Sequence, residues 1–148
     1  MEKQEVISTL KVIIAQITET DIVWRLEGSA NLSLQGIKTE VNDLDITTNK
    51  KGLEIFRELL NKYIIKDFFD TNINSHRLIL NINNFEVDIN CYNKLELNMF
   101  ESIKIISIDN LNIPVLPIKE SLKFYKIINR KNKISLIEEF LLKINKIN

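Results

Sequence analysis

The sequence of 148 residues contains a single cysteine, three glycines, two prolines and one histidine. One cysteine excludes a scaffold held by disulfides, and so little glycine and proline excludes collagen-like and linker-like chains. A lone histidine also excludes a histidine-rich metal site. Hydrophobic residues nevertheless make up 45% of the chain. That is enough apolar surface to offset chain entropy, so the composition indicates a folded protein.

The chain also lacks a net charge and a long hydrophobic run. Lys and Arg together number 20, as do Asp and Glu, so the basic excess of a general nucleic-acid coat protein is missing. No apolar run is long enough to span a bilayer, and residues 1–5 lack the basic start of a secretory signal. We therefore expect a cytoplasmic protein with no membrane partner.

The charge is unevenly distributed along the chain. From Lys119 onward, eight basic residues stand against three acidic ones, so the preceding part is correspondingly acidic. A basic C-terminal segment beside an acidic body is a first indication of a site that handles phosphate and metal. Two solvated helix faces would give the same count, so other residues must decide between these interpretations.

Hydrophobic periodicity predicts an α+β (mixed α/β) fold with both helices and strands. The chain length fits a single domain over 1–148, with a core of about 20–116 and C-terminal helices over about 117–146. Helices are expected over 3–19, 29–36, 49–60, from Pro117 onward, and over about 135–144. Strands are expected over 21–27, 43–48, 63–69, 77–82, 85–92, 104–108 and 111–116. Asn83-Asn84 and Asp109-Asn110 suit tight hairpin turns.

Three aspartates lie on or beside the expected strands. Asp43 and Asp45 are two residues apart, so on a strand their carboxylates share one face with Cα atoms about 6.5–7 Å apart. Like charges so close raise each other's pKa unless a cation is present, and Mg²⁺ prefers one or two carboxylates together with substrate phosphates. Asp88 has a similar position on the 85–92 strand, where Glu86 competes for the same role. If the two strands are neighbours, Asp88 completes an acidic triad.

Gly28 and Ser29 stand at a junction between an expected strand and an expected helix. Ser29 is a suitable N-cap for that helix. Free backbone N–H groups at a helix N-terminus favour a phosphate, glycine permits close approach of a ligand, and the serine hydroxyl can donate to a phosphate oxygen. Each feature alone is common in ordinary turns and exposed strands, so its significance comes from the combination.

The combination of Gly28-Ser29, Asp43-Leu44-Asp45 and Asp88 resembles the DNA polymerase beta-like nucleotidyltransferase superfamily. It is similar to the small single-domain members, the minimal and the lincosamide-type nucleotidyltransferases. The resemblance implies a small mixed β-sheet with flanking helices. It also implies transfer of a nucleoside monophosphate from a nucleoside triphosphate, such as ATP, to an acceptor hydroxyl, with release of pyrophosphate and with Mg²⁺ or Mn²⁺ as cofactor.

The resemblance also assigns roles to residues. Asp43, Asp45 and Asp88 would be the catalytic and metal-binding acids, with Asp88 activating the acceptor, and Gly28 and Ser29 would bind the nucleotide. Lys126 and Arg130 resemble a cationic pair that faces the nucleotide from a late helix. Their spacing of four predicts that they share one helix face. The sequence departs from its relatives at Asn132-Lys133, where an aspartate is expected.

Other functions remain compatible with the same residues. A non-catalytic nucleotide-binding or interaction subunit would keep the fold, and a toxin–antitoxin component would use a protein or an RNA as acceptor. A homodimer is possible because helical faces near both termini are open. The sequence does not indicate the preferred nucleotide, the acceptor, or whether Glu86 shares the role of Asp88.

Overall fold

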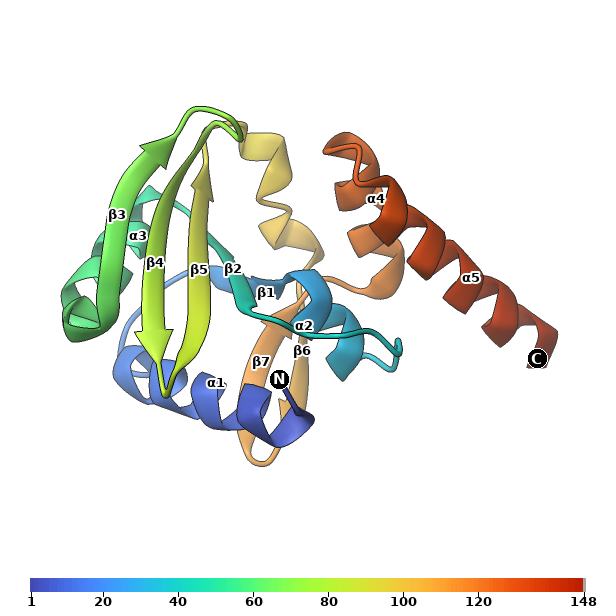
Figure 1. The fold of residues 1–148 in the computed structure, drawn as a ribbon, viewed down its shortest axis with the longest axis horizontal. Helices are drawn as coiled ribbons and strands as arrows, with labels where there is room; N and C mark the ends of the chain where they lie inside the picture. Colours follow the sequence, from blue (N-terminus) through green and yellow to red (C-terminus); the bar gives the residue numbers. More distant parts are fainter. Residues whose placement is uncertain (148) are drawn as a thin grey trace.

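The computed structural model describes residues 1–147, and Asn148, the last residue of the domain expected from the sequence, lies outside them. In this part of the chain, seven strands form one mixed sheet in the order β3-β4-β5-β2-β1-β7-β6 (Figure 1). The strands are β1 (Trp24–Glu27), β2 (Leu44–Thr48), β3 (Ile64–Asp70), β4 (Ser75–Ile82), β5 (Phe85–Tyr92), β6 (Lys104–Ile108) and β7 (Leu111–Val115). The helices are α1 (Lys3–Ile17), α2 (Gly28–Leu34), α3 (Lys50–Leu59), α4 (Ile118–Ile127) and α5 (Lys131–Ile147).

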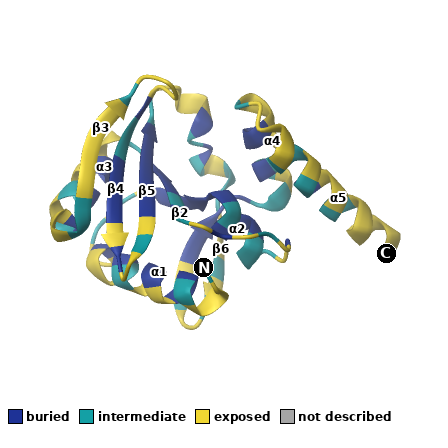
Figure 2. Cartoon of the chain, in the orientation of Figure 1, coloured by how far each residue is buried: buried dark blue, intermediate teal, exposed yellow. Residues whose placement is uncertain are grey.

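Alternation along the central strands gives the sheet one apolar and one polar face. Leu44 and Ile46 of β2 and Val87 and Ile89 of β5 are fully buried, and they belong to one core cluster. The same cluster contains the apolar stripe of α1 and the inner residues of α3, so these two helices cover the apolar face. Figure 2 shows the buried centre of the sheet and the exposed edge strand β3. The polar side chains of β1, β2 and β5 are thereby directed to the opposite face.

A second apolar cluster packs α2 against the C-terminal helices. It includes Leu32 of α2, Phe124 and Tyr125 of α4, and Ile137 of α5. Asn31 of α2 strengthens this contact, because its side-chain amide donates to the Ser121 hydroxyl at 3.1 Å. The cluster holds α4 and the start of α5 beside the polar face, while the far end of α5 extends away from the body (Figure 1).

The sequence predicted the mixed fold and both hairpins correctly. Asn83 and Asn84 have φ values of 55° and 70° and join β4 to β5, which is the backbone that a primed two-residue turn requires. Asp109 and Asn110 have φ values of 50° and 65° between β6 and β7. None of the helices in the described residues has the length and hydrophobicity needed to cross a bilayer.

The boundaries differ from expectation at four places that matter for the site. Strand β2 begins at Leu44, so Asp43 lies just before the strand and not on it as predicted. Strand β1 begins at Trp24, later than the expected residue 21. Helix α2 begins at Gly28 with Glu27 as its N-cap, so the prediction that Ser29 caps the helix is wrong. Helix α5 begins at Lys131, four residues before the expected start, and this places Lys133 in its first turn.

Candidate active site

Three acidic residues lie in one row across adjacent strands of the polar face. Asp45 of β2 pairs in register with Glu27 of β1 on one side and with Asp88 of β5 on the other. Side chains at paired positions of neighbouring strands share a face, so the three carboxylates project together. Asp43 lies immediately before β2, and the charge of Asp88 acts on it as well as on Asp45. The expected convergence of residues 43, 45 and 88 on one face is therefore present.

Gly28 brings the start of α2 against this acidic row. Its φ is +72°, and a Cβ added there would lie 3.2 Å from the carboxylate carbon of Asp45. Both the positive φ and the close approach favour glycine over any other residue. With Ser29 in the first turn of the helix and not at its cap, the hydroxyl is free to accept a hydrogen bond from the Lys133 ammonium.

The acids are crowded and partly removed from solvent, which changes their pKa values. Burial, reinforced by the charges of Glu27, Asp43 and Asp88, raises the pKa of Asp45 to about 8. Burial also raises the pKa of Asp43, with a further contribution from the charge of Asp88. Glu86 has a raised pKa because of burial and the nearby Asp43, to which it is hydrogen-bonded. A cation bound at this position would favour the ionised form of Asp45.

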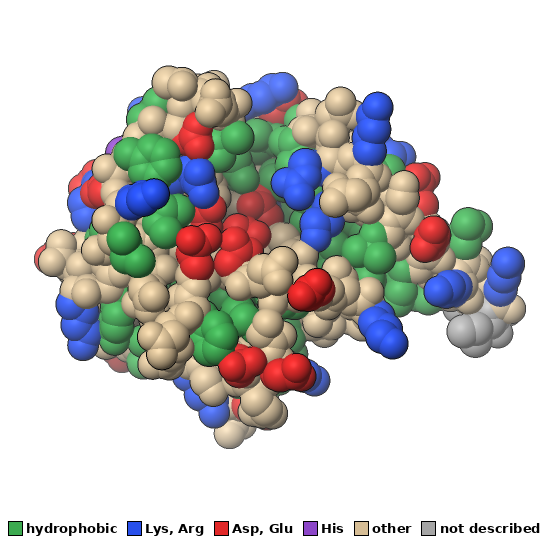
Figure 3. Space-filling view, in the orientation of Figure 1, with side chains coloured by type: hydrophobic (Ala, Val, Ile, Leu, Met, Phe, Trp, Pro, Cys, Tyr) green, Lys and Arg blue, Asp and Glu red, His purple; other side chains and the backbone are tan. Residues whose placement is uncertain are grey.

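Two cationic side chains of the C-terminal segment, Arg130 between α4 and α5 and Lys133 in α5, lie near the acids. A cavity of about 350 Å³ is open between them. Its lining comprises Gly28, Ser29, Thr39, Glu40, Asn42, Asp43, Asp45, Tyr125, Arg130, Asn132 and Lys133. Figure 3 shows the acidic side chains gathered in a hollow, with Lys and Arg side chains on both sides of it. The hollow thus has a negative floor and positive margins.

Arg130 lines the cavity, but the expectation that it shares a helix face with Lys126 is wrong. Helix α4 ends at Ile127. Asn129 follows with a φ of 56°, and the backbone N–H of Arg130 donates to the Tyr125 carbonyl at 3.0 Å. This is a left-handed helix terminus, which asparagine adopts more readily than most residues. Lys126 remains on α4, exposed and absent from the residues that line the cavity.

Lys133 is a site residue that sequence reasoning did not select. It is partly buried, donates to Ser29, and its charge acts on Asp43 and Asp45. Burial and the neighbouring Arg130 lower the pKa of its ammonium group. The local signals were its place in the basic C-terminal segment and the departure at Asn132-Lys133, but its position at the site depends on where α5 begins.

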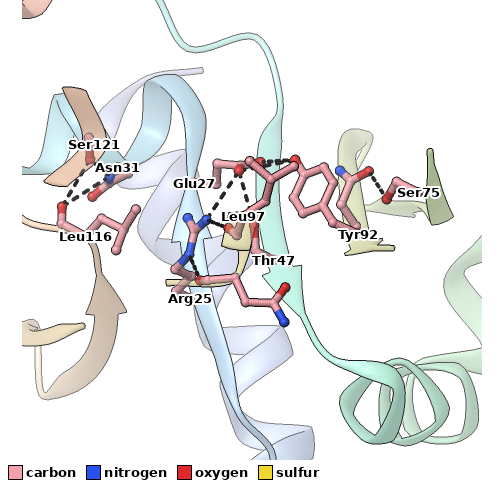
Figure 4. Close-up of polar contacts among 11 residues, drawn as sticks. Arg25, Glu27, Asn31, Thr47, Ser75, Tyr92, Leu97, Leu116 and Ser121 are labelled. Atoms are coloured by element: carbon pink, nitrogen blue, oxygen red, sulfur yellow. Dashed lines mark hydrogen bonds and ion pairs between the residues drawn. The ribbon is translucent and has the colours of Figure 1, made fainter. Parts of the chain in front are cut away.

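A buried polar network joins Glu27 of the acidic row to Arg25 and Tyr92 (Figure 4). Arg25 is fully buried and donates to the carbonyls of Leu97 and Asn98, each at 2.8 Å. Glu27 accepts from the Tyr92 hydroxyl at 3.1 Å and lies 3.6 Å from the Arg25 guanidinium. Since a buried charge is costly unless paired, these contacts fix the strand that leads into Gly28.

The donor set fits a hard divalent cation. In the described part of the chain, no three Asp, Glu, His or Cys side chains form a ready-made metal cage. Mg²⁺ commonly binds through only one or two carboxylates plus substrate phosphates, so a complete cage is not required. Asp43 and Asp45 line the same cavity, so their two carboxylates could share a cation.

Comparisons with known proteins agree with this geometry. The profile of the aminoglycoside-2''-adenylyltransferase family matches residues 9–135. A candidate nucleotidyltransferase from Thermotoga maritima is similar, with 22% identity, a TM-score of 0.77 and coverage of 97% of this chain and 96% of that one. No curated protein sequence matches the chain.

Two antibiotic-modifying enzymes share the fold at lower identity. The lincosamide adenylyltransferase LnuA, solved with lincomycin, has 12% identity and a TM-score of 0.60, over 88% of this chain and 95% of LnuA. ANT(2")-Ia, solved with adenylyl-2"-tobramycin, has 11% identity and a TM-score of 0.61, over 93% of this chain and 90% of that chain.

The family profile and the fold define a nucleotidyltransferase of the DNA polymerase beta-like superfamily, as the sequence resemblance implied. Within that class, the chain belongs to the aminoglycoside-2''-adenylyltransferase family. It is therefore an enzyme of nucleotidyl transfer.

Proposed function

We propose that the protein transfers a nucleoside monophosphate from a nucleoside triphosphate to an acceptor hydroxyl, in a reaction that requires a divalent cation. The main supporting observation is the register that aligns Asp45 with Asp88 across β2 and β5, with Gly28 packed against Asp45. A bound Mg²⁺ or Mn²⁺ would neutralise charge on the phosphates and on the leaving pyrophosphate.

The triphosphate would bind between the start of α2 and the start of α5. The backbone N–H groups at Gly28 and Ser29 would face phosphate oxygens, since a helix N-terminus favours negative charge. Arg130 and Lys133, which line the same 350 Å³ cavity, would donate to the remaining oxygens. Lys126 does not line this cavity, so we do not expect it to contact the triphosphate directly.

The acids would divide the remaining tasks. Asp43 and Asp45 would hold the cation, and Asp88, in the same row, would hold it and accept the proton from the acceptor hydroxyl. The acceptor oxygen would form a bond to the α-phosphorus as the bond from that phosphorus to the β-phosphate oxygen breaks. Positioning and charge neutralisation provide most of the rate enhancement in such a transfer.

Asp43→Asn is expected to abolish metal-dependent nucleotide binding and transfer, because it removes one of the two carboxylates nearest the phosphate site. The measurement is calorimetric titration of ATP, CTP, GTP and UTP with Mg²⁺ or Mn²⁺. A second assay follows transfer of the ³²P label from the α-phosphate of each triphosphate to a panel of acceptor molecules that includes lincomycin and tobramycin. Asp21→Asn is the matched control, since Asp21 is exposed and paired with Lys51. Unchanged nucleotide handling in Asp43→Asn would refute its assigned role, and binding without transfer to any acceptor would favour a non-catalytic subunit.

Lys133→Gln is expected to raise the KM for the triphosphate roughly tenfold, with a smaller change in kcat, because a charge-assisted phosphate contact is lost. Lys131→Gln is its control, since Lys131 is an exposed residue of the same helical turn. Initial rates across a range of triphosphate concentrations separate the two constants. An equal effect of both substitutions would mean that only the general charge of α5 matters.

A further inference from the structure

The guanidinium of Arg77 lies directly against the proposed base. From β4, its Nε donates to Asp88 at 3.2 Å and one terminal nitrogen donates to the other Asp88 oxygen at 2.5 Å. Its second terminal nitrogen donates to Asp70 of β3 at 3.0 Å. The guanidinium carbon also lies 5.5 Å from the centroid of the Phe68 ring. Arg77 is thus shared between two carboxylates and supported by an aromatic ring.

This arrangement occupies both oxygens of Asp88. The carboxylate is largely buried, and the amide of Asn90 approaches the same oxygen as the Arg77 Nε, at 3.3 Å. A divalent cation that is to share Asp88 with Asp45 must therefore compete with a positive charge already in place.

We propose that Arg77 is a positioning residue that competes with the catalytic metal for Asp88, and that Asp70 sets the strength of this competition. The inference rests on the proposed metal-dependent reaction. In the absence of metal, Arg77 neutralises Asp88 and holds its carboxylate toward the row. When a cation binds, the guanidinium weakens its hold on Asp88 and keeps its contacts with Asp70 and Phe68.

Asp70 and Asp88 both accept hydrogen bonds from the Arg77 guanidinium, so each weakens the hold of the other. Substitutions of Arg77 and of Asp70 should therefore have opposite effects on metal affinity. Arg77→Gln removes the competing charge and should tighten Mn²⁺ binding roughly tenfold. Asp70→Asn leaves Arg77 to Asp88 alone and should weaken Mn²⁺ binding roughly threefold. If Asp70 acts through Arg77, the Asp70→Asn change should have no effect on affinity once Arg77 is already Gln. A purely structural role would shift both single variants toward weaker binding.

The experiment is a titration of the full chain with Mn²⁺, in which free Mn²⁺ is followed by its electron paramagnetic resonance signal, with and without ATP. Arg77→Lys is a second variant that keeps the charge but not the two-point contact, and its affinity should lie between wild type and Arg77→Gln. Thermal unfolding without metal is a second readout. Arg77→Gln should unfold at a lower temperature, and saturating Mn²⁺ should remove most of the difference.

Arg57→Gln is the matched control, because the Arg57 guanidinium pairs with Asp67 of β3 and with Glu54 of α3, each at 2.7 Å. It should leave Mn²⁺ affinity unchanged. If wild type and Arg77→Gln bind Mn²⁺ with equal affinity, the role assigned to Arg77 is overturned, while the proposed metal-dependent reaction is not. A wild-type protein that binds no Mn²⁺, with or without ATP, would overturn the metal-dependent reaction and this inference with it.

Discussion

Asp45→Asn is expected to abolish nucleotidyl transfer and, at the same time, to stabilise the metal-free protein at pH 8. The loss of activity should exceed about a thousandfold, because a metal contributes several kcal/mol to transition-state charge stabilisation and about 1.4 kcal/mol corresponds to tenfold in rate. The gain in stability has a different cause. It follows from the cost of keeping an ionised carboxylate in a crowded, partly desolvated row.

The pH dependence of that gain follows from the direction of the pKa shift. Burial and three acidic neighbours raise the pKa of Asp45 from 3.8 to about 8 in the folded state. The folded protein therefore holds the proton more tightly than the unfolded chain, so wild-type stability falls as the pH rises between these values. Below this pH range the Asp45 carboxyl is protonated in both the folded and the unfolded state, so Asp45→Asn is no more stable than wild type. Above this pH range the stability difference between the two proteins is constant.

Thermal unfolding of the wild type and Asp45→Asn at several pH values, without and with Mg²⁺, checks this prediction. Solvent and structural relaxation reduce the stabilisation that the full pKa shift would imply. We therefore expect the free energy of unfolding of Asp45→Asn to exceed that of wild type by about 2 kcal/mol at pH 8, or its Tm to be higher by roughly 4–8 °C. Saturating Mg²⁺ with nucleotide should stabilise the wild type but not the variant. A variant that is less stable than wild type at pH 8 without metal would contradict the proposed charge crowding.

Gly28→Ala is expected to lower kcat at least about a hundredfold, because small displacements of reacting groups have effects of that size. The new Cβ would meet the Asp45 carboxylate, whose carbon would be only 3.2 Å away, and the backbone φ of +72° disfavours alanine. Either Asp45 turns away from the row or the start of α2 moves. In both cases the phosphate-binding N–H groups and the acids lose their alignment. Strain of about 1–3 kcal/mol should also lower stability.

Gly36→Ala separates the effect of backbone strain from the effect of the close approach to Asp45. Gly36 also has a positive φ, +103°, but a Cβ there would lie 3.9 Å from Phe140, an ordinary contact distance. The control should therefore lose stability through backbone strain while keeping most of its transfer activity. Steady-state kinetics and thermal unfolding of both variants make the comparison. Equal losses of kcat in the two variants would show that the close approach of Gly28 to Asp45 is not important for catalysis.

Local patterns were sufficient for the order of the helices and strands and for the positions of Asp45 and Asp88 on the sheet. The alternation of Asp45 with Leu44 and Ile46, and of Asp88 with Val87 and Ile89, identified which side chains leave the apolar face. The two turns beginning at Asn83 and Asp109 were correctly placed because their residues tolerate positive φ. These features depend on neighbours in sequence, so the sequence alone determined them.

Only the tertiary structure decided which partners the acids have. Glu27 joins the row through its register with Asp45, and Arg77 reaches Asp88 from a neighbouring strand. Lys133, and not Lys126, contacts the Ser29 hydroxyl, because α4 ends at Ile127 and α5 begins at Lys131. The sequence fixes the period of a strand or helix, whereas cross-strand register and the packing of a distant helix depend on non-local contacts that no single segment encodes.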